Sequence, residues 1–407
     1  MLAKTMQPVD AVIVGAGPVG SYTALRLAKL GVKTHVYEEH ATVGLPSHCA
    51  GHISIRSLKA LGYYPLPNGI VENTFSAANF YSPTGTRFAL KLKVPVTLAL
   101  NRAKFDQYLA QQAEAAGVTF HLGTRVQSLS LENGFVRGVY LQDGTRVPSK
   151  ITVDTEGISS RLLRQTGLQA LNPQGLVYAV ETEIDGVTDV EEHAVEVYMG
   201  SSAPGFYGWL IPRSDGTAKL GLATNHGNPQ AYLQRLIAKH PVASRQLKKA
   251  KIAKTSYHAI SLGGPIGKAY ANGFLAVGDV ASQVKPTTGG GVIFGLTCGE
   301  IAAEVAKAAL ERDDVSGEIL SLYQKRCNEA LDFDVSFMLR LRRFLNSLSD
   351  ERLDGVLRFC NRLSVDKALS DVEEIDFQGR MMLQVAAKPQ MLAALAYFGL
   401  LYLSANH

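Results

Sequence analysis

Three glycines near the start of the chain have the spacing of a phosphate-binding turn. They form Gly15-x-Gly17-x-x-Gly20 directly after the apolar run 11–14. The first glycine permits a tight turn, the second lets a pyrophosphate approach the backbone, and the third lets helix and strand pack closely. Apolar residues at helical spacing over 21–30 predict a helix whose N-terminal amides face the same phosphates.

An acidic residue follows where a ribose-binding carboxylate is expected. Gly31 ends the predicted helix, residues 33–37 form a second predicted strand, and Glu38 comes directly after it. The distance from the glycines to Glu38 is close to the roughly 20 residues of the dinucleotide fingerprint. Strand, turn, helix, strand and acid therefore predict a dinucleotide site, with Glu38 as an ordinary surface acid being the alternative.

A second group of residues has complementary chemistry. A buried strand is predicted over 273–278 and ends in Asp279, and three glycines, 289–291, precede a helix expected over 292–310. A carboxylate at a strand end can accept a hydrogen bond from a ribityl or ribose hydroxyl, and glycines let the backbone approach a phosphate or a ring. Together with the N-terminal fingerprint this pattern indicates one long dinucleotide held from two sides. FAD fits that length better than NAD.

Composition limits the remaining classes of function. A net charge of +5 on 407 residues, without aromatic and basic residues interleaved, does not indicate a nucleic-acid partner. The four cysteines show no metal-type spacing, so we expect no zinc site, iron–sulfur cluster or disulfide framework. Without a signal-peptide pattern, the chain is expected to be cytoplasmic. The apolar segment 391–403 is shorter than the roughly 20 residues of a membrane-spanning helix.

The element pattern predicts an interleaved α/β architecture. Antiparallel-type strands are expected over 178–224, a helix over 228–249, and helices over most of 318–403. The expected fold class is a Rossmann-type FAD-binding domain with an interleaved antiparallel-sheet substrate domain and a helical C-terminal region. The expected domains are residues 1–75 with 100–170 and 270–315 for FAD, 76–99 with 171–269 for the substrate sheet, and 316–407 for the helices.

Several longer motifs resemble a known family. They are the glycine fingerprint with Glu38, Pro46-Ser-His-Cys-Ala-Gly51, Asn101-Arg-Ala-Lys-Phe-Asp106, Tyr207-Gly-Trp-Leu-Ile-Pro212, and Gly278-Asp-Val-Ala-Ser-Gln-Val-Lys-Pro-Thr-Thr-Gly-Gly-Gly291. With them the chain resembles FAD-dependent enzymes of the p-hydroxybenzoate-hydroxylase-like fold and, within that group, the geranylgeranyl reductase family. The resemblance covers residues 8–310 well and the helical tail weakly.

The resemblance implies a role for individual residues. The adenine end of FAD would lie on the glycine turn, and the ring end near Cys49, Ala50 and Asp279. The FAD contacts that it implies are Gly15, Gly17, Gly20, Glu38, Cys49, Ala50, Arg102, Val126, Asp279, Gly290, Gly291 and Val292. The residues that it implies for a lipid-binding cavity are Tyr207, Trp209 and Pro212. Core packing on a strand is the alternative for Tyr207 and Trp209.

Two departures from the family pattern are visible. The usual Asp-Gly pair is Glu156-Gly157 here, which puts one minor cofactor contact in doubt. Ile211 replaces the aromatic residue before Pro212, which brings that motif nearer to flavin halogenases. The halogenase motif begins with a Trp, where this chain has Tyr207. The Cys49-Ala-Gly loop also differs from halogenases, so the sequence does not favour a halogenase.

The resemblance implies flavin-dependent reduction of isoprenoid double bonds in geranylgeranyl chains, expected on archaeal-type ether lipids or their precursors. Cys49 is the candidate catalytic residue, with a small buried side chain as the alternative. The electron donor, NADPH or ferredoxin, stays open, and a monomer is expected. Other candidate functions are reduction of a quinone or menaquinone side chain, electron-transfer oxidoreduction, monooxygenation, and non-catalytic prenyl-lipid carriage.

The helical tail contributes a candidate head-group site. Arg340, Arg342 and Arg343 stand within about one helical turn beside apolar residues. Arginine forks suit a phosphate, and Arg340 and Arg343 are the expected substrate contacts. The 391–403 helix could shield the same entrance or touch a bilayer surface, so peripheral membrane contact is possible. A solvated basic face on an ordinary amphipathic helix is the alternative.

Overall fold

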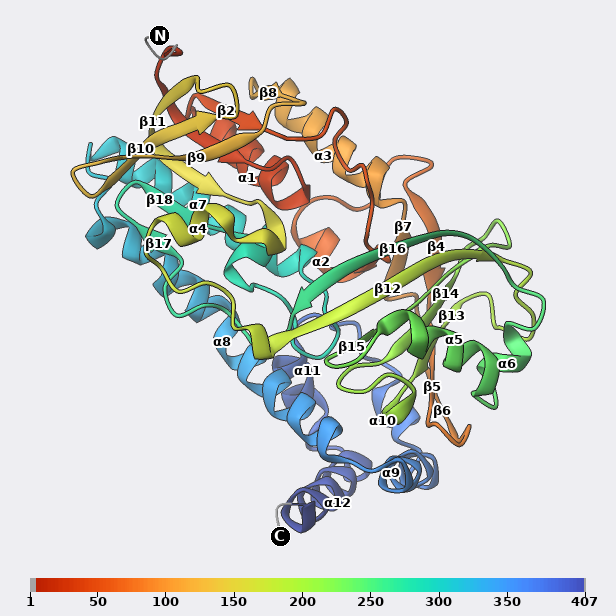
Figure 1. Cartoon of the computed structure of the whole chain (residues 1–407). Helices are drawn as coiled ribbons and strands as arrows, with labels where there is room; N and C mark the ends of the chain where they lie inside the picture. Colours follow the sequence, from red (N-terminus) through yellow and green to blue (C-terminus); the bar gives the residue numbers. More distant parts are fainter. Residues whose placement is uncertain (1–4, 406–407) are drawn as a thin grey trace. The chain divides into compact units, whose positions relative to one another are not determined.

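The computed structural model describes residues 5–405 (Figure 1). The contacts within the chain divide it into two compact units. The first unit comprises Met1–Ser47, Arg102–Gly175 and Ser261–Asp332, and the second comprises His48–Asn101, Leu176–Ile260 and Phe333–His407. The α/β fold class with C-terminal helices is confirmed. The unit limits differ from the three expected regions, because residues 48–75 and the C-terminal helices group with the antiparallel sheet.

The first unit contains a mostly parallel sheet with the order β17-β18-β11-β1-β2-β8, which β10 and β9 extend from β11. Strands β18, β11, β1, β2 and β8 pair in parallel. Helix α1 packs against α3 and α7 (Figure 1). The bounds are β1 Val9–Val14, α1 Pro18–Lys29, β2 Thr34–Tyr37, α3 Arg102–Ala115, β8 Thr119–His121, β9 Val126–Glu132, β10 Phe135–Leu141, β11 Arg146–Asp154, α4 Arg161–Gln165, β17 Tyr270–Ala271, β18 Phe274–Ala276 and α7 Val292–Glu311.

The second unit contains a seven-stranded sheet, β16-β12-β15-β14-β13-β5-β6, and a three-stranded sheet, β3-β7-β4. The bounds are β3 His52–Ser54, α2 Ile55–Ala60, β4 Val71–Phe75, β5 Ala77–Tyr81, β6 Arg87–Lys91, β7 Thr97–Leu100, β12 Leu176–Asp185, β13 Ala194–Tyr198, β14 Gly208–Pro212, β15 Ala218–Thr224, α5 Pro229–Lys239, α6 Ala243–Gln246 and β16 Lys251–Ser261. Each strand in the row β12, β15, β14 and β13 pairs antiparallel with the next, as the 178–224 pattern predicted.

The C-terminal helices of the second unit pack on strand β6. Phe88 of β6 shares a buried apolar cluster with Val356, Leu357, Met391 and Ala394. This cluster explains why the helices group with the antiparallel sheet. The bounds are α8 Gly317–Ser347, which the unit boundary crosses, α9 Asp350–Arg362, α10 Val365–Leu369, α11 Gln378–Val385 and α12 Pro389–Ala405.

The helix expected over 228–249 is shorter than predicted. Asn228 caps α5 by accepting a hydrogen bond from the Gln230 amide, and Pro229 occupies the first turn, as expected. The helix nevertheless ends at Lys239. Pro241 disfavours the helical conformation of the residue before it, and His240 is extended with φ −67° and ψ 128°. The expectation of one continuous helix was therefore wrong.

Candidate functional site

The glycine turn between β1 and α1 has the geometry that its sequence predicts. Gly15 has φ +99°, a conformation that favours glycine. A Cβ at Gly20 would lie 2.0 Å from the carbonyl oxygen of Gly15, so only glycine allows this close packing. A Cβ at Gly17 would meet no atom within 4 Å. Gly17 therefore presents open space at the helix N-terminus, where a pyrophosphate can approach the backbone.

Glu38 lies directly after β2 and bonds back to this turn. Its Oε2 accepts a hydrogen bond from the Ala16 amide at 2.8 Å. Its Oε1 accepts from the His40 amide at 2.9 Å and lies 2.6 Å from His40 Nδ1. The carboxylate is thus fixed beside the glycine turn, which is the position that ribose recognition requires.

The second predicted group converges in the same unit. Asp279 lies in a 3₁₀ turn, Gly278–Ala281, directly after β18, and Val292 begins α7. A Cβ at Gly291 would lie 2.4 Å from Asp279 Oδ1, and one at Gly290 would lie 2.6 Å from Lys285 Cε. These two glycines leave the backbone bare beside a carboxylate and a helix N-terminus, which suits a ribityl chain and a ring.

Arg102 and Asp279 belong to one electrostatic environment. Protein around Asp279 raises the pKa of its carboxyl by desolvation, and the Arg102 charge opposes that rise. Asp279 nonetheless stays exposed to solvent and accessible to a ligand. Arg102 itself is buried and donates to both carboxylate oxygens of Asp106 at 3.1–3.2 Å. Val126 begins β9, and its carbonyl already accepts a hydrogen bond from Arg161.

Gln283, which lies in the quoted 278–291 motif but had no predicted role, and Tyr323, which the sequence did not point to, support the Asp279 turn. The Gly278 amide donates to Gln283 Oε1 at 2.7 Å, and Gln283 Nε2 donates to the Tyr323 hydroxyl at 2.8 Å. The Tyr323 hydroxyl in turn donates to the Ala276 carbonyl at 2.8 Å. This buried chain of hydrogen bonds ties the backbone before Asp279 to helix α8.

Cys49 lies in the second unit, in an irregular segment before β3. Its side chain is partly exposed, whereas Cys298, Cys327 and Cys360 are buried. The Gly51 amide donates to Cys49 Sγ at 3.4 Å. Cys49 is therefore the accessible thiol of the chain, although the segment contains no helix or strand to hold it in place.

A histidine of β16 is coupled electrostatically to the Cys49 segment. Desolvation and the neighbouring His48 lower the pKa of His258 to about 4. Its Nδ1 is buried without a hydrogen-bond partner among the described residues. The imidazole is therefore neutral at physiological pH and adds no positive charge beside the segment.

The aromatic motif lies at the start of β14 in the second unit. Trp209 is 7% exposed and donates from Nε1 to Glu181 Oε2 at 3.0 Å, and Pro212 is buried. Tyr207 is half-buried, stacks on Phe206 with ring centroids 4.2 Å apart, and meets Trp209 edge-on at 6.1 Å. Tyr207 therefore retains an accessible surface, while Trp209 is held within the sheet.

The arginine that reaches this motif is Arg342. Its guanidinium lies over the Phe206 ring, 5.6 Å from the centroid, and desolvation lowers its pKa to about 10 against the opposing effect of Tyr207. Arg340 and Arg343 are exposed. Helical spacing could have identified Arg342, because it lies four residues after Met338, which is fully buried on the same face.

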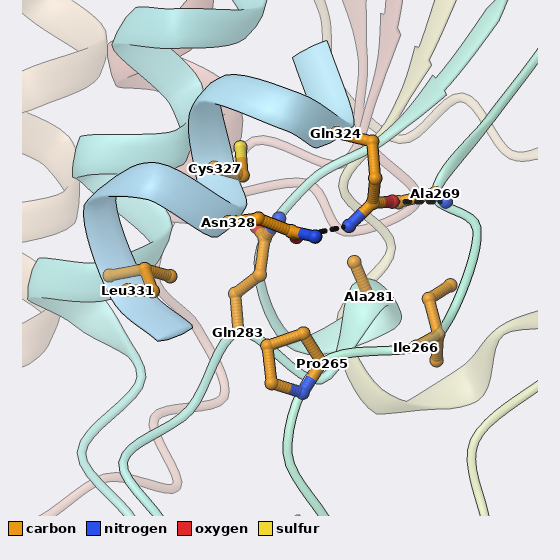
Figure 2. Close-up of a pocket in the computed structure, with 9 residues that line it drawn as sticks. All are labelled: Pro265, Ile266, Ala269, Ala281, Gln283, Gln324, Cys327, Asn328 and Leu331. Atoms are coloured by element: carbon orange, nitrogen blue, oxygen red, sulfur yellow. Dashed lines mark hydrogen bonds between the residues drawn. The ribbon is translucent and has the colours of Figure 1, made fainter. Parts of the chain in front are cut away.

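A small recess in the first unit is lined in part by Gln283, which also supports the Asp279 turn (Figure 2). About 220 Å³ of space between atoms, including open solvent, lies between α8 and the 265–283 segment, but it has no room for a water molecule. The Gln324 amide group spans it by accepting from the Ala269 amide and donating to Asn328 (Figure 2). None of the predicted site residues lines it. Among the described residues no cluster has the composition of a metal site, and no described helix is long and apolar enough to cross a membrane.

Comparison with known proteins agrees with this geometry. The family described as "FAD binding domain" matches residues 8–299. Digeranylgeranylglycerophospholipid reductase 2 of Methanopyrus kandleri is 32% identical over 394 residues, which are 94% of this chain and 97% of that protein. The digeranylgeranylglycerophospholipid reductase of Methanocaldococcus jannaschii is 30% identical over 389 residues, which are 94% and 96% of the two chains.

Solved structures share the fold over nearly the whole chain. A geranylgeranyl bacteriochlorophyll reductase-like protein of Thermoplasma acidophilum matches with a TM-score of 0.86 and 26% identity, covering 97% of this chain and 100% of that one. A flavin-dependent brominase matches with a TM-score of 0.71 and 19% identity, covering 93% and 98%. The likeness to the brominase extends to the fold alone.

Proposed function

The chain belongs to the family of digeranylgeranylglycerophospholipid reductases and contains an FAD binding domain, and from this membership we propose that it reduces carbon–carbon double bonds of geranylgeranyl chains. The substrates would be archaeal-type ether lipids or their precursors. The observation that carries the proposal is the cradle of the first unit. Gly17 is open, Gly291 faces Asp279, and FAD fits between a glycine turn and a carboxylate of this kind.

The chain supplies position and environment for the chemistry. Bound FAD, once reduced, supplies a hydride to one alkene carbon. Asp279 and the amides at Val292 would hold the ribityl and ring region, and Glu38 the adenine ribose. An isolated alkene is unactivated, so the cavity must exclude water and fix the double bond. Tyr207, Trp209 and Pro212 are proposed to line that cavity. Trp209 would form a rigid part of its wall, because the bond to Glu181 holds it in the sheet.

The second alkene carbon needs a proton, and Cys49 is the proposed residue nearest to it. A thiol has an ordinary pKa of about 8.5 and is a weak acid. Cys49 would donate the proton or shape the flavin environment. The electron donor is proposed to be NADPH or ferredoxin, and the functional unit a monomer.

Anaerobic single turnover tests the proposed function. Flavin reduced in the holoenzyme is mixed with digeranylgeranylglycerophospholipid, and flavin reoxidation and product mass are followed. The expected result is reoxidation with masses rising in steps of two hydrogens. Reoxidation only by a quinone substrate would favour side-chain reduction of quinones, and oxygen consumption with NADPH would indicate a monooxygenase. Bound lipid without reoxidation would indicate a carrier.

The arginines of α8 give a prediction on substrate recognition. We expect Arg340→Gln with Arg343→Gln to raise KM for the phospholipid about tenfold, since a charge-assisted hydrogen bond contributes about 1.5–3 kcal/mol. Geranylgeraniol has no anionic head and should be unaffected. Arg342→Gln, the matched change on the buried face, should impair both substrates because Arg342 supports Phe206 and Tyr207. Equal losses on both substrates in the double variant would make Arg340 and Arg343 ordinary surface charge.

Helix α12 gives a prediction on membrane contact. It contains no charged residue, and Leu392 and Leu400 are 57% and 67% exposed. We propose that these leucines insert into the surface of the bilayer that holds the lipid substrate. Burial of a leucine contributes about 1.5–3 kcal/mol. Leu392→Glu with Leu400→Glu should therefore lower binding to anionic vesicles at least about tenfold in a sedimentation assay.

The matched control for α12 is Leu322→Glu, which changes an exposed leucine of α8 in the first unit. Vesicle binding should stay at the wild-type level in this variant. Loss of binding in both variants, or in neither, would contradict contact through α12.

A further inference from the structure

A buried lysine of the second unit contacts the Cys49 segment. Lys219 lies on β15 and is 5% exposed. Its Nζ donates to the carbonyl oxygens of Ala50 and Leu100, both at 3.1 Å, and lies 3.2 Å from Glu72 Oε2. An ammonium group has three protons, and three oxygens surround this one. Lys219 therefore joins the large sheet to the residue directly after Cys49.

A second backbone contact holds the same segment. The Gly51 carbonyl accepts a hydrogen bond from the Leu100 amide at 2.9 Å. Ala50 and Gly51 are thus held through consecutive carbonyls, one by Lys219 and one by Leu100. Residues 46–51 contain no helix or strand. Removal of the ammonium would leave the Ala50 carbonyl without the hydrogen bond that ties it to β15.

Lys219 also links this segment to the aromatic motif. Its positive charge opposes the rise in the pKa of Glu181 that burial causes. Glu181 accepts the hydrogen bond of Trp209 Nε1 at 3.0 Å. Glu72 forms a second ion pair with Arg213 at 3.3 Å, one residue beyond Pro212. Lys219 therefore combines direct contacts to the backbone beside Cys49 with an electrostatic effect on the carboxylate that Trp209 binds.

We propose that Lys219 is a positioning residue, which fixes the Cys49–Gly51 segment for alkene reduction through the carbonyl of Ala50. The proposal rests on the proposed function as far as the reaction is concerned. Stability alone does not explain a buried lysine here, because apolar residues of similar volume often replace buried ion pairs without loss of stability. Lys219 has donors that an apolar side chain lacks, and two of them point at backbone carbonyls around the candidate catalytic thiol.

The test measures Cys49 directly in the FAD-loaded protein. Lys219→Met keeps an unbranched apolar stem, one heavy atom shorter than lysine, but removes the donors. The other three cysteines are buried, so the initial reaction of a disulfide reagent with native protein reports Cys49, and Cys49→Ser verifies this. We expect the thiol to react about tenfold faster in Lys219→Met, because the segment opens more often. The single-turnover rate should fall about tenfold with KM and FAD content unchanged.

The matched control is Lys388→Met. Lys388 Nζ also donates to a backbone carbonyl, that of Ala368 at 2.6 Å, on a segment apart from Cys49. Thiol reactivity and turnover should stay at wild-type values in this variant. Should Lys219→Met fail to fold, Lys219→Met with Glu72→Gln also removes the carboxylate that Lys219 faces, and it tests the same contact to Ala50.

Two results would overturn the positioning role. One is unchanged thiol reactivity and turnover in either folded Lys219 variant. The other is a fall in turnover that is accompanied by a lower melting temperature and by changes in KM and FAD content. A purely structural role of Lys219 would produce that result. The thiol measurement needs no substrate. If wild-type protein reduces no prenyl alkene, the proposed function fails, whereas the thiol reactivity still decides whether Lys219 holds the segment.

Discussion

Gly17→Val is expected to fold but to lose FAD. A Cβ at Gly17 would meet no atom within 4 Å, so the substitution begins in open space. It does occupy the space through which the pyrophosphate approaches the helix N-terminus. Each hydrogen bond between a backbone amide and the charged pyrophosphate that is lost contributes about 1.5–3 kcal/mol. The Kd for FAD, measured by titration of apoprotein, should rise about 100-fold or more.

Two other glycines separate this effect from general damage. Gly267 also has open space around its Cβ position, so Gly267→Val should retain FAD and the apoprotein melting temperature. Gly20→Ala should fail to fold normally, because its Cβ would lie 2.0 Å from the Gly15 carbonyl oxygen. A Gly17→Val protein purified with a full complement of FAD would remove the basis for placing the cofactor at this turn.

Cys49→Ser is expected to bind FAD and lipid normally but to reduce alkenes slowly. Serine keeps the size and the hydrogen-bonding capacity of cysteine, while its hydroxyl is a much weaker acid than a thiol. Loss of a positioned proton donor costs typically about 100-fold or more in rate. The single-turnover rate of reduced flavin with the lipid should therefore fall by at least about that factor, while FAD content and lipid binding stay unchanged.

Cys360→Ser is the matched control for the thiol. Cys360 is buried in the second unit, and burial raises the pKa of its thiol to about 11. Its replacement should lower the melting temperature without changing the single-turnover rate, since a buried hydroxyl needs a partner. A wild-type rate in Cys49→Ser would return Cys49 to a purely structural role.

Local spacing was enough to predict the nucleotide-binding turn and its neighbours. The close approach of Gly20 to the Gly15 carbonyl arises between residues five positions apart, and the positive φ of Gly15 is likewise a property of the turn. Thr155, which follows the distant strand β11, also approaches both glycines, and that contact could not be predicted from spacing. The N-cap at Asn228 was predictable for the same reason. The break after Lys239 could also have been anticipated from Pro241, because the restriction on the preceding residue is local.

The sequence alone determined the FAD fingerprint, the α/β class and the motifs of the reductase family. The tertiary structure decided how distant side chains meet. Lys219 and Ala50 are 169 positions apart, and no spacing rule connects them. Trp209 was expected to line a cavity, and its bond to Glu181 depends on the place of β12 in the sheet. Residue types and short spacings specify turns and caps, whereas strand order and register determine which buried charges and carbonyls come within hydrogen-bonding distance.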